Sequence, residues 1–466
     1  MRTTILAPAL VAALTVGACK TLDVEDFNAS ALSDLQNSPT SASIATAATG
    51  VLVGSRGLEG IPQWAFTAIT GELGREGYST DPSNPNINVS RLQNMDQGAG
   101  GSANWQAAYR GLKQAAVLIG AVDGVTGFTA VQKAAVKGFA KTMQAQILLA
   151  VVNMFDDAGA VIDFSAQFSG DPKPIVSRDA AFAKVISLLD EAKTDLTGGG
   201  TAFPFPLSAG FSGFDTPATF LRFNRALRAR AEVYRGSLGG GATNYTAALT
   251  ALTESFLDTS RPFSLGVYHT FSTASGDQTN PLFDPIPRII FAHPSTLPDA
   301  KVNGATKDLR ATSKVALLPA PKQVNGVTVD SKLLLYPTGG SPKAIIRNEE
   351  LILIRAEARL QTGDLAGALA DINLVRTTAG GLPVIDATTW NALTTAQRID
   401  SLLYERRYSL LMEGGHRWID ARRYGRLATL PKALPAHKVY PRFLIPDDEC
   451  VARTPAPVGC TAPTGF

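Results

Sequence analysis

The chain has 466 residues, with 43 lysine and arginine residues against 40 aspartate and glutamate residues, so its formal net charge is only +3. This near balance argues against a general nucleic-acid-binding protein, because that class needs a dense basic surface. Apolar residues make up 45% of the sequence and charged residues 18%. This composition excludes a disordered chain and predicts a large buried core.

The N-terminus has the pattern of a secretory signal. Arg2 precedes an apolar run from Ile5 to Val16, which is too short to span a bilayer as a helix. The run ends in Val-Gly-Ala-Cys at 16–19, which resembles the lipobox of bacterial lipoproteins and makes Cys19 the predicted lipidation site. The alternative is an ordinary signal peptide followed by a chance cysteine. We expect a signal peptide at 1–18, a lipid-anchored tether at 19–40 and a single folded body at 41–466.

Paired helices are predicted from Ser41 onward. In the helix that begins near 130, apolar side chains from Val136 to Met154 recur at helical spacing on one face. Helix pairs are expected near 130–196, 219–257, 348–378 and 396–426. Residues 356–369 resemble a tetratricopeptide unit, in which small alanines allow two helices to approach closely. These patterns predict a mainly α fold with a tetratricopeptide-like scaffold, long irregular loops and a few short strands, the strands mostly within 259–347.

Motifs for catalysis or cofactor binding are not found in the sequence. It contains no H-E-x-x-H, G-x-S-x-G, P-loop or calcium-loop pattern. Its four histidines are scattered singly, and carboxylate pairs suited to glycoside hydrolysis are not singled out by any local pattern. Cys450 and Cys460 have no nearby histidine, so a disulfide is predicted there in an oxidising compartment, and a zinc site is not. We predict no metal and no other cofactor.

The segment 399–425 is dense in charges of both signs. If one helix continues past Gly414 and Gly415, then Glu413, Arg417, Asp420 and Arg423 share a face and form a charge ladder. A binding site for an anion is one interpretation. The favoured one is a structural charge network, joined by Glu405, that locks this segment to the scaffold.

The same segment resembles the C-terminal signature of the SusD/RagB family. The run from Glu405 to Gly425 reads E-R-R-x-x-L-x-x-E-G-x-R-x-x-D-x-R-R-x-G, with Gly415 one residue in excess of the usual family spacing. Further similarity lies in Ile-Asn-Leu-Val-Arg at 372–376 followed by Gly-Gly-Leu-Pro at 380–383, in the helix at 348–358, and in Trp-Gln-Ala-Ala-Tyr at 105–109.

This resemblance implies a function as well as a fold. SusD-like proteins are non-catalytic outer-membrane lipoproteins that bind a nutrient, often a glycan, at the cell surface. They act as the lid of a TonB-dependent, SusC-like β-barrel transporter. The resemblance therefore implies a lipid-anchored, surface-exposed protein with no nucleic-acid partner. Two alternatives stay open: a lipid-anchored secreted hydrolase, and a helical scaffold lipoprotein for outer-membrane assembly.

Candidate ligand contacts come from two groups of side chains, because sugars stack on aromatic rings and bond polar side chains. One group surrounds a predicted loop at 71–104, and the other lies in the irregular region. The candidates are Trp64, Arg75, Tyr78, Asp81, Asn84 and Asn86 in the first group, and Tyr268, His269 and Phe271 in the second. The sequence does not distinguish a glycan from a peptide or another nutrient, and Trp105 and Trp418 are expected in the core.

Overall fold

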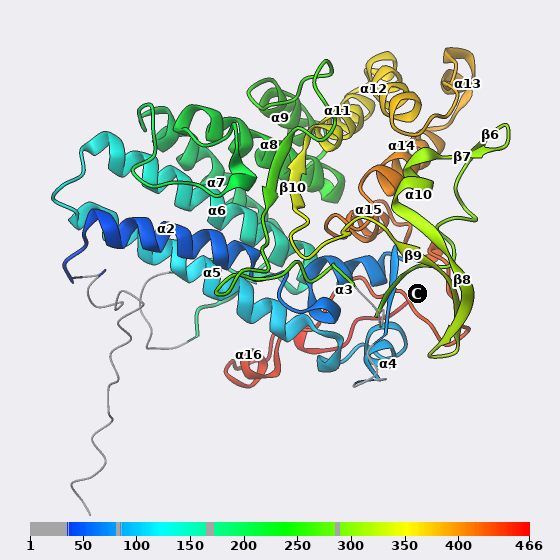
Figure 1. Ribbon diagram of the computed structural model, residues 1–466, viewed down its shortest axis with the longest axis horizontal. Helices are drawn as coiled ribbons and strands as arrows, with labels where there is room; N and C mark the ends of the chain where they lie inside the picture. Colours follow the sequence, from blue (N-terminus) through cyan, green and yellow to red (C-terminus); the bar gives the residue numbers. More distant parts are fainter. Residues whose placement is uncertain (1–34, 36, 81–83, 85, 165–171, 285–288) are drawn as a thin grey trace, which may run out of the picture.

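The computed structural model describes residues 35, 37–80, 84, 86–164, 172–284 and 289–466 (Figure 1). Consecutive long helices pack side by side and form a helical scaffold that runs across the molecule. These helices are α2 (Ser41–Arg56), α5 (Gly101–Ala121), α6 (Ala130–Phe155), α7 (Arg178–Thr197), α8 (Pro217–Arg235), α9 (Gly241–Thr253), α11 (Asn348–Thr362), α12 (Leu365–Thr378) and α14 (Thr395–Ser409). The predicted mainly α fold with paired helices is confirmed.

Several of these helices begin at a capping box with a threonine at the N-cap position. Thr129 accepts a hydrogen bond from the backbone N–H of Gln132, whose side chain in turn bonds the backbone N–H of Thr129. The same reciprocal arrangement starts α2 at Thr40, α8 at Thr216 and α14 at Thr394. Each box satisfies amide groups that the first turn of a helix leaves without an intrahelical partner.

Helix α6 lies at the centre of the scaffold, and its burial exceeds the single apolar face that its sequence predicts. It packs against α2, α5, α7 and α8. From Thr142 to Phe155 nearly every side chain is therefore buried, including those between the predicted apolar positions. Gly138 allows the closest approach, since a Cβ atom there would lie 2.6 Å from Cγ of Leu196 on α7.

The strands form short antiparallel pairs, and the described residues contain no larger sheet. The pairs are β1 (Gly77–Ser79) with β5 (Ile290–Ala292), β2 (Ala160–Val161) with β3 (Ile175–Val176), β4 (Gly266–His269) with β10 (Lys343–Arg347), β6 (Val302–Asn303) with β7 (Thr306–Lys307), and β8 (Val315–Val324) with β9 (Val327–Leu333). The β8–β9 hairpin projects at the right-hand side of Figure 1.

Two predictions about local structure were wrong. Residues 71–104 are not one long loop: they hold the end of α3 (Phe66–Leu73), then β1, α4 (Ile87–Leu92) and the start of α5. The helix pair expected near 396–426 is α14 and α15 (His416–Arg423), but the single helix past Gly414 and Gly415 that a charge ladder requires is not formed, because α14 ends at Ser409. Gly414 and Gly415 between them adopt φ angles of 143° and 71°, outside the helical range. The remaining short helices are α10 (Leu309–Lys314), α13 (Ala387–Ala392) and α16 (Asp447–Val451).

Candidate ligand-binding cleft

A surface cleft of about 410 Å³ lies where α2, the turn η5 (Ala209–Phe211) and strand β4 meet. Helix α2 contributes its second half, and the segment 206–211 forms the opposite wall. Its lining comprises Thr49, Leu52, Val53, Ser55, Arg56, Pro206, Leu207, Ser208, Phe211, Tyr268, His269, Thr270, Gly276 and Asp277. Of the predicted ligand residues, the structure brings Tyr268 and His269 into this cleft. Phe271 is buried directly behind it.

The pairing of β4 with β10 sets the direction of these side chains. Tyr268 pairs with Ala344 and His269 with Lys343, so neighbouring residues alternate between the two faces. Val267 and His269 are buried, whereas Tyr268 remains partly exposed with its hydroxyl bonded to the carbonyl of Ser264. A Cβ atom on Gly210 would lie 1.9 Å from the carbonyl oxygen of Tyr268, so a glycine is required for η5 to rest on β4.

A charged pair fixes the rim of the cleft. Arg56 bonds Asp277 at 2.5 Å and the carbonyl of Thr270 at 2.5 Å, and its guanidinium lies 5.3 Å from the ring centroid of Phe271. These contacts tie the loop 270–277 to the end of α2. Arg56 and Asp277 were missed by the sequence analysis, because no local pattern connects residues that meet only in the fold.

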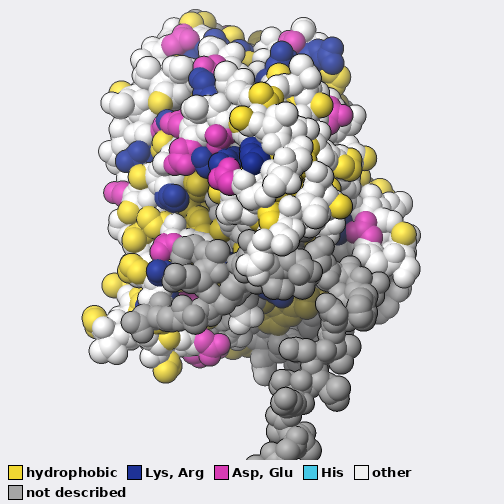
Figure 2. Space-filling model, turned by 90° about the vertical axis from the view of Figure 1, so that its left-hand side faces the viewer, with side chains coloured by type: hydrophobic (Ala, Val, Ile, Leu, Met, Phe, Trp, Pro, Cys, Tyr) yellow, Lys and Arg dark blue, Asp and Glu magenta, His cyan; other side chains and the backbone are white. Residues whose placement is uncertain are grey.

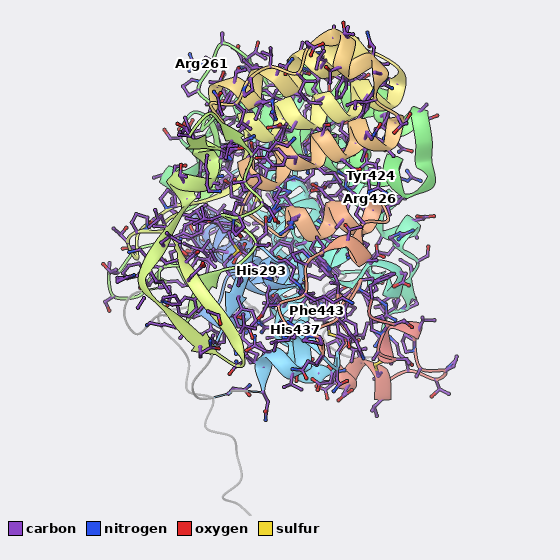
Figure 3. All side chains as sticks on the ribbon, turned by 90° about the vertical axis from the view of Figure 1, so that its right-hand side faces the viewer. Arg261, His293, Tyr424, Arg426, His437 and Phe443 are labelled. Carbon is purple, nitrogen blue, oxygen red and sulfur yellow. A yellow bond between two sulfur atoms is a disulfide. The ribbon has the colours of Figure 1, made fainter. Side chains whose placement is uncertain are left out.

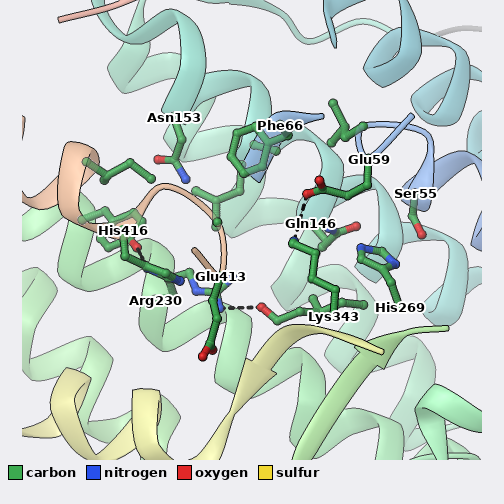
Figure 4. A pocket seen from close by; sticks show the side chains of 17 residues that line it. Ser55, Glu59, Phe66, Gln146, Asn153, Arg230, His269, Lys343, Glu413 and His416 are labelled. Carbon is green, nitrogen blue, oxygen red and sulfur yellow. Dashed lines mark hydrogen bonds and ion pairs between the residues drawn. The ribbon is translucent and has the colours of Figure 1, made fainter. Parts of the chain in front are cut away.

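Behind the cleft lies a smaller polar cavity of about 50 Å³ (Figure 4). Ser55 and His269 line both spaces, so they form the partition between them. Within the cavity, Lys343 pairs with Glu59 at 2.9 Å. Burial, together with the charges of Lys343 and Arg56, lowers the pKa of His269 well below its usual value. The imidazole of His269 therefore favours the neutral form.

The aromatic and arginine candidates of the first group lie elsewhere. Arg75 is buried and donates to the backbone carbonyls of Glu72, Leu73, Pro431 and Lys438. Tyr78 is 1% exposed in β1. Trp64 is partly buried under the guanidinium of Arg91, at 5.3 Å. In this structure these three side chains serve packing and do not line the cleft.

The polar candidates near α4 also lie apart from the cleft. Asn86 is exposed at the start of α4, and Asn84 is partly buried just before it. Asp81 lies outside the described residues, as does Cys19. The structure therefore separates the first predicted group from the second instead of joining them in one site.

The predicted charge network is buried and extends across the scaffold. Arg423 bonds Glu357 on α11 and also Asp420, which in turn accepts from Arg406 at 2.6 Å. Glu405 pairs with Arg376 at 2.8 Å and with Arg310 at 2.6 Å. These contacts link α14 and α15 to α10, α11 and α12, which is the locking role favoured from the sequence. Figure 3 shows Tyr424 and Arg426 beside this region.

A single ladder along one helix was the wrong geometry for this network. Because the chain turns between α14 and α15, Glu413 does not pair with Arg417; it bonds Arg347 at 2.7 Å and lies 3.5 Å from Lys314. Burial alone would raise the pKa of Glu413, but these two cations lower it to about 2. Arg417 instead donates to the carbonyl of Arg75 at 2.6 Å.

The C-terminal tail is held by a covalent bond. Cys450 on α16 and Cys460 form a disulfide with their Cα atoms 5.8 Å apart. Among the described residues, no group of three or more His, Cys, Asp or Glu side chains is placed to hold a metal ion. None of the helices in the described part of the chain combines the length and apolar character needed to cross a bilayer.

The C-terminal part of the chain carries sequence similarity to a known family. Residues 336–449, which include β10, the α11–α12 pair and the buried charge network, match the model of the SusD family. Over these residues the chain is similar to the SusD/RagB family. No curated protein matches it in sequence.

Solved SusD structures share the fold over most of the chain. NanU of B. fragilis is 16% identical with a TM-score of 0.62, covering 86% of this chain and 93% of its own. A laminarin-binding SusD-like protein is also 16% identical with a TM-score of 0.62, covering 88% of this chain and 97% of its own. A SusD superfamily protein from Bacteroides vulgatus is 16% identical with a TM-score of 0.61, at 84% and 91% coverage. At these identities the likeness concerns the fold.

Proposed function

We propose that this SusD-family protein is a cell-surface lipoprotein that binds a glycan nutrient in the cleft at Tyr268 and delivers it to a SusC-like TonB-dependent transporter. The observation that carries the proposal is the cleft itself, which lies at the surface of a SusD fold. Its volume of about 410 Å³ is within the usual range for small-molecule sites. A structural neighbour that binds laminarin has the same fold.

The chemistry of the cleft suits a sugar. The partly exposed ring of Tyr268 offers an apolar face for stacking. Thr49, Ser208 and Asp277 offer donors and acceptors for hydroxyl groups around it. Arg56 already fixes Asp277 and the loop 270–277. A ligand that binds here therefore causes little further loss of conformational entropy.

The lining of the cleft suits a protein that binds a sugar without hydrolysing it. Glycosidases place two carboxyl groups on either side of the scissile bond, roughly 5 to 9.5 Å apart. Among the residues that line this cleft, Asp277 alone carries a carboxylate, and it is held by Arg56. This arrangement supports a binding protein over the lipid-anchored hydrolase.

The transporter partnership rests on the family and on the N-terminal pattern. Lipidation at Cys19 and the tether at 19–40 would hold the body at the outer membrane while leaving it free to move as a lid. On its left-hand side the molecule carries acidic and basic side chains interspersed, without a broad field of one sign (Figure 2). Such a surface supports a partner other than nucleic acid.

Binding to a glycan array, followed by titration calorimetry with the best glycan, tests this function. We expect Tyr268→Ala to weaken binding at least about tenfold, which corresponds to about 1.4 kcal/mol. Trp64→Ala is the matched control, because Trp64 is an aromatic candidate outside the cleft, and it should bind like the unmodified protein. Circular dichroism checks that both variants are folded. Equal binding by the Tyr268→Ala variant, or a folded protein that binds no glycan, would refute the proposal.

A further inference from the structure

A second surface cleft, of about 450 Å³, lies at the other end of β4. Its apolar part includes Phe214, Phe256 and Leu265, and the two rings meet edge to face with centroids 4.9 Å apart. Its charged lining consists of Arg222, Arg261 and Asp258. It therefore combines an apolar floor with an excess of positive charge.

Arg222 and Arg261 are both exposed, and within the described residues neither guanidinium group makes a hydrogen bond or an ion pair. Arg222 lies on α8. Its neighbours on that helix, Arg225 and Arg228, differ from it because both form ion pairs with Asp190. Figure 3 shows Arg261 at the upper edge of the molecule, away from the packed interior. Two free guanidinium groups on one cleft provide a donor set that matches a carboxylate or a sulfate.

The acidic group in the cleft does not neutralise these arginines by direct pairing. The carboxylate of Asp258 accepts hydrogen bonds from the backbone N–H of Ser260 at 2.8 Å and from its hydroxyl at 2.6 Å. The carboxylate of Asp258 is therefore hydrogen-bonded within the turn at 258–260. The side chain of Asn348 bonds the backbone N–H and carbonyl of Asp258, so the loop that carries Arg261 is anchored to α11.

The two clefts are lined by different residues of the same two chain segments, 206–214 and 265–270. Segment 206–211 lines the first, and Gly213 and Phe214, just beyond η5, line the second. Leu265, just before β4, lines the second cleft, and Tyr268 within β4 lines the first. Three residues of extended chain separate these positions by about 10 Å.

We propose that the second cleft binds the acidic group of a saccharide. This inference rests on the proposed function and narrows it to acidic glycans. The carboxylate of a uronic or sialic acid and the sulfate of a sulfated sugar present the same chemistry to Arg222 and Arg261. The apolar floor at Phe214 and Phe256 contacts the sugar ring that carries the charge.

An array of oligosaccharides bearing uronic acid, sialic acid or sulfate, beside neutral counterparts, tests the proposal and separates these sources. For uronic acid, the pair is trigalacturonate and its methyl ester, measured by calorimetry. We expect at least one acidic class to bind about tenfold more tightly than its neutral counterpart. This preference should shrink between about 0.01 M and 1 M salt, because exposed charges are screened.

The double variant Arg222→Gln/Arg261→Gln should lose the preference for the acid while retaining the weaker binding of the neutral sugar. Arg110→Gln is the matched control, because Arg110 is an exposed arginine of α5 outside both clefts. The inference is overturned if no acidic class is preferred, or if the double variant keeps the preference. Loss of neutral binding in Tyr268→Ala tests the first cleft separately, so failure of one proposal does not hide failure of the other.

Discussion

Arg423 shows how much of this fold depends on buried charge. Its side chain is 1% exposed, and its guanidinium bonds two carboxylates, those of Glu357 and Asp420, whose side chains are 0% and 4% exposed. A buried pair of this kind adds little net stability compared with an apolar pair, because both ions lose their hydration. Removing one partner is different, since the other charge is then left buried and unpaired.

We expect Arg423→Met to destabilise the fold by about 3–5 kcal/mol, because Glu357 would stay buried without its cation, whereas Asp420 would keep Arg406. Arg426→Met is the matched control, since Arg426 pairs with Asp400 at the surface, with side chains 32% and 54% exposed. Its loss should cost less than about 1 kcal/mol. Urea unfolding measures both. Similar losses for the two variants would contradict a structural role for the buried network.

Glu76 is a buried carboxyl group of a different kind. Neither of its oxygens has a hydrogen-bond partner in the described part of the chain. Burial raises its pKa to about 8, despite the opposing effect of the nearby Arg417. The folded protein therefore binds this proton more tightly than the unfolded chain does.

The sign of the pH effect follows from this raised pKa. The contribution of Glu76 to stability is complete below the unfolded pKa of 4.5 and is lost as the pH rises toward 8. We expect Glu76→Gln, which mimics the neutral acid, to remove this decline in urea unfolding between about pH 5 and 9. The exposed Asp179→Asn control should retain it. A Glu76→Gln variant that loses stability with pH as the unmodified protein does would exclude this role for Glu76.

At the scale of elements, helical periodicity was the dependable signal. The pair expected near 348–378 is α11 and α12, and the pair expected near 219–257 is α8 and α9. Capping threonines and apolar spacing are local, so they are readable from the sequence. The short elements within 71–104 were missed because β1 is held by its partner β5, which lies more than 200 residues away.

The turn between α14 and α15 was missed for a related reason. The two glycines permit a helix to end but do not require it, and here the end is set by packing. A Cβ atom on Gly415 would lie 2.4 Å from the side chain of Thr70 on α3, so this turn fits only a glycine against α3.

Substitutions at two glycines can therefore distinguish the loss of stability due to steric contact from the loss due to backbone strain. Gly415 and Gly425 have φ angles of 71° and 66°, but a Cβ atom on Gly425 would meet nothing within 4 Å. Gly425→Ala should cost about 1–2 kcal/mol from the left-handed backbone alone. Gly415→Ala should cost about 1–3 kcal/mol more, from overpacking against Thr70. Equal losses in urea unfolding would show that the contact with α3 is not limiting.

At the scale of the whole molecule, the family and the fold could be predicted from the sequence, and the cleft could not. The family signature lies in a contiguous run of residues, whereas Arg56 and Thr270 at the cleft are 214 positions apart. Tyr268, His269 and Phe271 were selected as aromatic residues in an irregular region. Trp64 and Tyr78 were also selected as aromatic residues, and Arg75 as a polar one, but all three lie in other surroundings, because residue type alone does not reveal burial.

The central claim is that this molecule is the binding component of an outer-membrane importer. Affinity purification of the tagged lipoprotein from gently solubilised outer membranes, with mass spectrometry of the proteins that accompany it, tests the claim most directly. The account predicts a TonB-dependent β-barrel in a stoichiometric amount, and its loss from the membrane fraction when Cys19→Ser removes the lipid anchor. A protein that is recovered alone from intact membranes would contradict it.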